Sequence, residues 1–136
     1  MNHLIIGGGP AAFSAASLLR RLDRTSRITV LTREKMPPYA RIALPYLVSG
    51  AVDEELLFLP MPGDVELLTG EEACAIRPEL REVRTSSGKA ISYDRLLLAT
   101  GADPLKPEIS GIDLPFVFTL RDIPDAKSIR KILKET

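Results

Sequence analysis

The stretch Leu4-Ile5-Ile6-Gly7-Gly8-Gly9-Pro10-Ala11-Ala12 decides the fold class of this 136-residue chain. Its apolar residues predict a buried parallel strand, its glycines a tight turn, and Pro10 the first turn of a helix that continues from Ala11 to Leu22. A second apolar run, Ile28 to Leu31, follows. Strand, helix and strand within about thirty residues form a βαβ unit, whose right-handed crossover makes the strands parallel. The sequence therefore predicts an α/β protein with a Rossmann-like core.

The rest of the chain is predicted to add short strands and two helices to this core. Segments bounded by turn residues predict an inserted antiparallel β-meander at 65–68, 73–76, 82–85 and 90–93. Leu96 to Ala99 is predicted as a further, fully apolar strand, and 116–119 as the last one. A short helix is predicted over 43–48, ending at Gly50, and a final helix opens at Asp122 and Pro124. On the first helix, the residues predicted to face the sheet are Ala12, Ala15, Ala16, Leu19 and Leu22.

Composition narrows the classes of partner and the compartment. Eighteen basic and eighteen acidic residues cancel without a like-charged block, so neither a nucleic-acid nor an anionic-membrane partner is expected. The single cysteine, Cys74, forms no internal disulfide, and no Cys/His cluster indicates a metal site. Neither a charged leader nor a long apolar run is present, which makes the reducing cytoplasm the expected location.

The glycine turn has the pattern of a dinucleotide-binding loop. Gly7 permits the tight turn, Gly9 lets the backbone approach a pyrophosphate, and Ala12 replaces a third glycine where helix and strand pack closely. Pro10 and Ala11 open the helix, whose N-terminus offers free N–H groups and a partial positive charge to the phosphates. The alternative is a turn that serves only to reverse the chain.

A carboxylate about twenty residues further on usually accepts hydrogen bonds from the adenosine ribose. Glu34, just after the second strand, is the candidate, although a solvated loop charge would look the same. Arg33 beside it is suited to a 2′-phosphate, so NADP stays open as an alternative to FAD or NAD on this feature.

The stretch Tyr93-Asp94-Arg95-Leu96-Leu97-Leu98-Ala99-Thr100-Gly101-Ala102, together with the glycine turn, resembles the FAD domain of the pyridine nucleotide-disulfide oxidoreductase superfamily. In that superfamily's second flavin motif a strand ends in Ala-Thr-Gly and its backbone turns beside FAD. The resemblance covers nearly the whole chain. It implies that FAD is the cofactor and that Thr100 and Gly101 lie beside it.

Two further segments are similar to parts of that superfamily's FAD domain, the first of them to the branch that contains the rubredoxin reductases, ferredoxin reductases and NADH-dependent nitrite reductases. Pro37-Pro38-Tyr39-Ala40-Arg41, followed by Leu44-Pro45-Tyr46, resembles the segment that runs along FAD, which implies that Arg41 lies near the flavin phosphates. Gly70 to Ile76 resembles the strand whose backbone meets adenine, which implies a contact at Ala73.

Some positions depart from the family pattern. Ile42 stands where the coenzyme A disulfide reductase and NADH oxidase branch has an active cysteine, which excludes thiol chemistry of that kind. Tyr46 stands where ferredoxin-reductase relatives have a lysine near the flavin. Cys74 is expected to be a buried, inert thiol and His3 a structural residue, so no catalytic side chain is assigned.

Length is the larger departure. Family enzymes continue into an NAD(P)H domain and then return to the FAD domain with a Gly-Asp motif, and Gly63-Asp64 lacks the apolar strand which that motif needs. Residues 1–136 are therefore expected to be a partial FAD-binding domain, with NAD(P)H bound only by the missing part.

Three functional hypotheses follow. The first is the FAD-binding portion of a flavin-dependent NAD(P)H oxidoreductase that does not complete hydride transfer alone. The second is a stand-alone dinucleotide-binding or subunit module, for FAD or NADP, without turnover; its open sheet edge predicts a homodimer or association with a completing chain. The third is a folded remnant that binds nothing.

Overall fold

The computed structural model describes residues 1–135, and the chain divides into two compact units. Unit 1 consists of Met1–Tyr39 and Leu59–Gly101. Unit 2 consists of Ala40–Phe58 and the chain from Ala102 onward.

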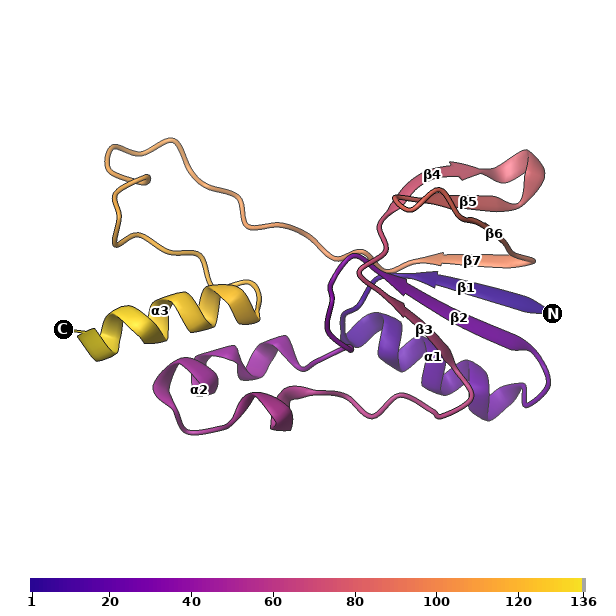
Figure 1. Cartoon of the computed structure of the whole chain (residues 1–136), viewed down its shortest axis with the longest axis horizontal. Helices are drawn as coiled ribbons and strands as arrows, with labels where there is room; N and C mark the ends of the chain where they lie inside the picture. Colours follow the sequence, from indigo (N-terminus) through magenta and orange to yellow (C-terminus); the bar gives the residue numbers. More distant parts are fainter. Residues whose placement is uncertain (136) are drawn as a thin grey trace. The chain divides into compact units, whose positions relative to one another are not determined.

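Unit 1 is built on a four-stranded parallel sheet (Figure 1). Its elements are β1 (Asn2–Ile6), α1 (Pro10–Leu22), β2 (Arg27–Thr32), β3 (Glu66–Thr69) and β7 (Arg95–Leu98). The strand order is β3-β2-β1-β7. In register, Ile5 of β1 lies between Val30 of β2 and Leu97 of β7. The predicted βαβ unit and its parallel strands are confirmed.

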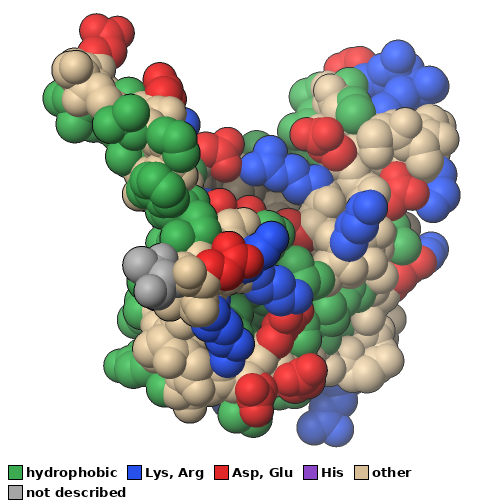
Figure 2. Space-filling model, turned by 60° about the vertical axis from the view of Figure 1, so that its left-hand side comes forward, with side chains coloured by type: hydrophobic (Ala, Val, Ile, Leu, Met, Phe, Trp, Pro, Cys, Tyr) green, Lys and Arg blue, Asp and Glu red, His purple; other side chains and the backbone are tan. Residues whose placement is uncertain are grey.

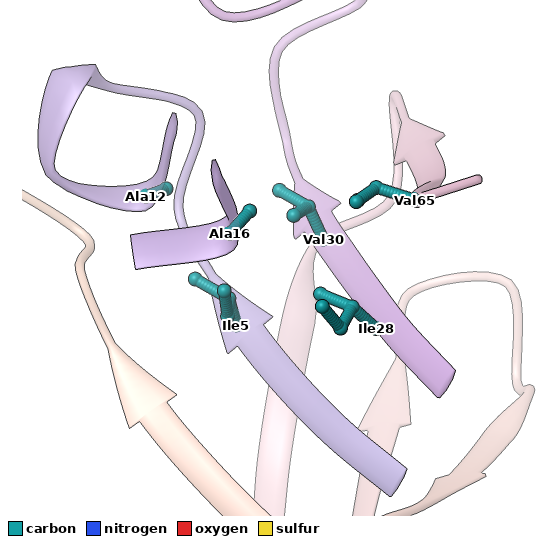
Figure 3. Close-up of a cluster of buried hydrophobic side chains, with 6 residues drawn as sticks. All are labelled: Ile5, Ala12, Ala16, Ile28, Val30 and Val65. Atoms are coloured by element: carbon teal, nitrogen blue, oxygen red, sulfur yellow. The ribbon is translucent and has the colours of Figure 1, made fainter. Parts of the chain in front are cut away.

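Helix α1 covers one face of this sheet with small side chains. Ala12 and Ala16 are fully buried and point at Ile5 and Val30, in a cluster that also holds Ile28 and Val65 (Figure 3). Small residues let the helix lie close to the sheet, as the helical spacing predicts. Ala15 and Leu19 also pack here, whereas Leu22, predicted to face the sheet, is 76% exposed because it ends the helix.

The opposite face of the sheet packs against a three-stranded antiparallel meander. It consists of β4 (Ala73–Arg77), β5 (Glu82–Thr85) and β6 (Ala90–Ser92). Val83 of β5 is fully buried with Leu4, Ile6 and Leu31 of the parallel sheet. Because alternate residues of β1 face opposite sides, Leu4 and Ile6 meet the meander while Ile5 meets α1.

One predicted meander segment, 65–68, was assigned to the wrong sheet. It forms β3, which pairs with β2 in parallel, with Leu67 opposite Val30 and Leu68 opposite Leu31. The two leucines point to opposite faces and both are half-buried, which is the pattern of a strand covered on both sides.

Strand β7 is an edge strand of the parallel sheet, and its last residues are exposed. Leu97 is 42% and Leu98 is 58% exposed, although their partners on β1, Ile5 and Ile6, are buried. Within unit 1, the parallel sheet is therefore covered on both faces at β1 but not at the end of β7.

Unit 2 contains two helices. Helix α2 (Leu44–Ser49) follows a 3₁₀ turn at Arg41–Ala43 and ends at Gly50, whose φ of 78° is left-handed, as predicted. Helix α3 (Ile123–Glu135) begins after Asp122, whose Oδ1 accepts a hydrogen bond from the Asp125 N–H at 2.9 Å.

The predicted strand at 116–119 is wrong. Residues 99–122 contain no strand, and Phe116 is 76% exposed. β-propensity reflects packing on a pleated surface, and within unit 2 the described residues provide no sheet for this segment to join.

Charge is mixed on the visible surface. Figure 2 shows acidic and basic side chains interspersed with hydrophobic ones on the face that it presents. In the described part of the chain, no helix is long and apolar enough to span a membrane, and no group of three His, Cys, Asp or Glu residues could hold a metal ion.

Candidate functional site

The glycine turn lies at the point where the strand order reverses. From β1 the chain builds the sheet in one direction through β2 and β3, and β7 is added on the other side of β1. In open α/β sheets, ligands bind at the carboxyl ends of the strands beside this reversal. The turn that follows β1 therefore lies where a ligand is expected.

Gly7 is held between the two strands that flank β1. Its N–H donates to the Leu31 carbonyl of β2 at 2.8 Å, and its φ is 139°. A Cβ at this position would lie 2.5 Å from the carbonyl carbon of Ala99 and closer still to its oxygen. Because those atoms are backbone, nothing here can move aside for a side chain.

Gly8 is a second close approach, which the sequence reasoning missed. A Cβ on Gly8 would lie 3.0 Å from the Cβ of Thr32 and closer to its hydroxyl. That hydroxyl accepts a hydrogen bond from the Glu34 N–H at 3.2 Å. The middle glycine thus makes room for Thr32, which fixes the backbone of Glu34. The only signal in the sequence was that the residue between Gly7 and Gly9 is also a glycine.

The N-terminus of α1 follows directly. Gly9 is the N-cap in extended conformation, and Pro10 is the first helical residue. The first helical hydrogen bond runs from the Phe13 N–H to the Gly9 carbonyl at 3.1 Å. Ala11 and Ala12 come before Phe13 in the chain, so their N–H groups make no hydrogen bond within the helix. They point outward along the helix axis, as anion-binding helix termini require.

Other predicted contacts lie around the same edge of unit 1. Glu34 is half-buried, and its carbonyl accepts a hydrogen bond from the Gly70 N–H at 2.8 Å. Ala73 begins β4 and packs on the Leu4 cluster. Thr100 and Gly101 are exposed directly after the β7 end, and Gly101 has a φ of 74°. Shortly after β7 ends at Leu98, the chain thus has a left-handed backbone conformation that favours glycine.

Arg41 belongs to unit 2. Its guanidinium Nη1 donates to the Arg121 carbonyl at 3.1 Å, which ties the 3₁₀ turn to the segment before α3. Ile42, beside it, is 88% exposed, and Tyr46 is exposed on α2.

The structure of unit 1 tests two other predictions, for Cys74 and for Gly63-Asp64. Cys74 is exposed, which makes the expectation of a buried thiol wrong: Ala73 faces the core, so the next residue faces solvent. Asp64 pairs with Arg20 of α1 at 2.8 Å in a loop before β3, in agreement with the absence of a strand before the Gly63-Asp64 pair.

Two carboxylates of the β3 region have pKa values below their usual range. Hydrogen bonds from Lys89 and then Ser87 and Thr85 lower the pKa of Glu71 to about 2. A hydrogen bond from Thr29, followed by the influence of Arg27, lowers the pKa of Glu66 against the opposing effect of burial. Both groups are therefore anions at neutral pH.

Comparison with known proteins agrees with this geometry. The family model described as pyridine nucleotide-disulphide oxidoreductase matches residues 1–136. The chain belongs to this family. An NADH oxidase of Methanocaldococcus jannaschii is 32% identical over 146 residues, which cover 99% of this chain and 33% of that protein.

Solved structures of family members share the fold. The NAD-dependent persulfide reductase from A. fulgidus is 34% identical with a TM-score of 0.88, covering 99% of this chain and 27% of that one. The ferredoxin reductase for the CYP199A2 system of Rhodopseudomonas palustris is 32% identical with a TM-score of 0.86, covering 98% and 34%. The chain thus spans about a third of the length of the oxidoreductases it matches.

Proposed function

We propose that residues 1–136 are part of an FAD-binding domain and that the whole protein is a flavin-dependent NAD(P)H oxidoreductase. The observation that carries the proposal is the backbone of the glycine turn at the strand reversal. Gly7 leaves no room for a side chain, and the α1 N-terminus follows at once. Such a cradle fits the pyrophosphate of a dinucleotide, because only backbone lies in its path.

The residues of the chain have distinct roles in this proposal. The N–H groups of Ala11 and Ala12 would face the pyrophosphate, with Gly9 and Pro10 leaving the approach open. Glu34 would accept hydrogen bonds from the ribose hydroxyls at the end of β2. The protein in this way supplies placement and electrostatics.

The remaining contacts are proposed from the family resemblance. Ala73 would meet adenine, Thr100 and Gly101 would lie beside the flavin, and Arg41 would contact its phosphates. FAD held by these residues would supply the chemistry of hydride transfer from NAD(P)H, and we propose that residues 1–136 do not complete that transfer alone.

A titration with FAD, ADP, FMN and NADP⁺ tests the proposal. We expect FAD to bind, with quenching of the flavin fluorescence, and ADP to compete with FAD for the site. FMN should bind far more weakly because it lacks the adenosine end. FAD binding no tighter than FMN would contradict the proposal, and tight NADP⁺ binding without FAD binding would favour the 2′-phosphate alternative at Arg33.

Variants locate the site in the same assay. Gly9→Val puts a branched side chain in the path of the pyrophosphate and should abolish FAD binding. Gly63→Val is the matched control, because a Cβ at Gly63 meets nothing within 4 Å. Equal affinities of the two variants would place the site elsewhere.

We also propose that the chain associates through β7, as a homodimer or with a completing chain. The support is the exposure of Leu97 and Leu98 on an apolar edge strand, since such edges attract further strands. A clean monomer by light scattering at high concentration would count against this.

A reducing compartment such as the cytoplasm is part of the same proposal, because one cysteine per chain provides no internal disulfide.

A further inference from the structure

The turn between β3 and β4, Gly70–Glu72, is bonded to the end of β2. The Gly70 N–H donates to the Glu34 carbonyl at 2.8 Å, and the Glu71 N–H donates to the Thr32 carbonyl at 3.0 Å. The backbone around Glu34 is therefore fixed from two sides, by this turn and by the Thr32 hydroxyl that its own N–H contacts.

The side chain of Glu71 anchors this turn to the meander. Its carboxylate accepts hydrogen bonds from Lys89 Nζ at 2.7 Å and from Ser87 Oγ at 2.8 Å. The Glu71 side chain is only 14% exposed, and Ser87 is itself bonded to Thr85 at 3.1 Å. We call Glu71, Ser87 and Lys89 the clasp.

A second link runs alongside the clasp. The Ser86 N–H donates to the Glu72 carbonyl at 2.8 Å, and the Glu72 N–H donates to Ser86 Oγ at 3.2 Å. The hairpin turn between β5 and β6 is thus held on the turn between β3 and β4. Glu71 and Lys89 are 18 residues apart, so the clasp closes the stretch of chain that contains β4 and β5.

We propose that the clasp positions the Gly70–Glu72 turn, and through it the Glu34 backbone, for the adenosine end of FAD. This inference rests on the proposed function. The physical reason is preorganisation: a loop that is already ordered loses less conformational entropy when a ligand binds. Glu71 acts through Gly70 and Glu34, which makes it a positioning residue.

Glu71→Gln tests the inference by calorimetric titration with ADP and with FAD. We expect both dissociation constants to rise by the same factor, about fivefold, because the adenosine end is common to the two ligands. Lys89→Met should match this loss, and Lys89→Arg should retain wild-type affinity because it keeps a charged hydrogen-bond donor.

Glu66→Gln is the matched control. Glu66 lies at the amino end of β3, the strand that precedes the Gly70–Glu72 turn, and its carboxylate pairs with Arg27 Nη2 at 2.9 Å. The Glu66→Gln variant loses a comparable ion pair, far from the strand ends that carry the proposed site. Affinity for ADP and FAD should stay at the wild-type value.

Amide hydrogen exchange gives a reading that does not depend on a ligand. Glu71→Gln should speed exchange at the Gly70 N–H, which bonds the Glu34 carbonyl, by a larger factor than at the amides of β1. An equal factor at Gly70 and throughout β1 would mean general destabilisation alone and would overturn the positioning role.

The outcomes separate the two proposals. If the wild-type chain binds FAD and ADP but Glu71→Gln binds them equally well, the clasp has no positioning role and the proposed function stands. Equal losses in Glu71→Gln and Glu66→Gln would likewise overturn the inference. If the wild-type chain binds neither ligand, the proposed function and the inference both fail.

Discussion

Gly7→Ala should destabilise the chain more than any other single methyl group added to a glycine of unit 1. The new Cβ would lie 2.5 Å from the Ala99 carbonyl carbon, nearer to its oxygen, and 3.2 Å from the Thr100 nitrogen. These atoms belong to the backbone at the end of β7, which is paired with β1. Relief therefore requires one of the two strands to move.

Two costs add at this position. A residue with a Cβ at a φ of 139° lies outside its ordinary regions, which costs about 1–3 kcal/mol. Overpacking against atoms that cannot yield costs about 1–3 kcal/mol more. The sum is about 4 kcal/mol, a large part of the roughly 5–15 kcal/mol that stabilises a typical domain. For a chain of this size the melting temperature should fall by about 14 °C.

Urea unfolding followed by circular dichroism measures this loss, with two glycine controls. At Gly88 the φ is 83° and an added Cβ would meet nothing within 4 Å. Gly88→Ala therefore carries only the backbone cost, about 1 kcal/mol. Gly63→Ala has neither a positive φ nor a contact and should stay within about 0.5 kcal/mol of wild type. If Gly7→Ala came within about 1 kcal/mol of Gly88→Ala, the close approach to Ala99 would be refuted.

Three further changes test other features of unit 1. The pKa of Glu71 is lowered from 4.5 to about 2 on folding, so its stabilisation is complete above pH 4.5 and is lost as the pH falls toward 2. The urea midpoint of Glu71→Gln should therefore fall less than that of wild type between about pH 5 and about pH 2.5, and parallel curves would contradict this. Ala16→Leu overpacks the fully buried contact with Ile5 and should cost about 1–3 kcal/mol by thermal unfolding; an unchanged melting temperature would show that α1 is not closely packed. Leu98→Ser should cost less than about 1 kcal/mol because Leu98 is 58% exposed, whereas Ile6→Ser beside it should cost several times more, and similar urea midpoints would argue against an open β7 edge.

Much of the core could be predicted from the sequence because its signals are local. Three apolar residues followed by glycines and Pro10 indicate strand, turn and helix through neighbouring residues alone. The spacing of Ala12 and Ala16 indicates which side of the helix is buried, and both are fully buried. Part of the need for glycine at position 7 is likewise a property of one residue, its φ of 139°, whereas the close approach of Ala99 is a contact with a distant segment.

Predictions failed where the outcome depended on distant parts of the chain. Segment 65–68 has the same apolar character in either sheet, and its parallel pairing with β2 is decided by a connection of more than thirty residues. The strand predicted at 116–119 has β-forming residues, but no partner strand lies within the described residues of unit 2. Cys74 faces solvent because its neighbour Ala73 faces the core.

The roles of the candidate site residues stay predictions, although the structure explains why some were foreseen and one was not. Gly7 and Gly9 were proposed from the spacing of the turn. Gly8 was overlooked because its function depends on Thr32, which β2 brings alongside it from 24 positions further along the chain.

The sequence by itself determined the βαβ core, the tight turn at Gly7 and the helix start at Pro10, because each depends on backbone conformation and burial within a few residues. Only the tertiary structure decided the rest: the side of β1 on which β7 lies, the exposure of Leu98 on that edge, and the pairing of Glu71 with Lys89. These features arise when segments distant in the chain meet, and such meetings depend on how all the buried surfaces are satisfied together.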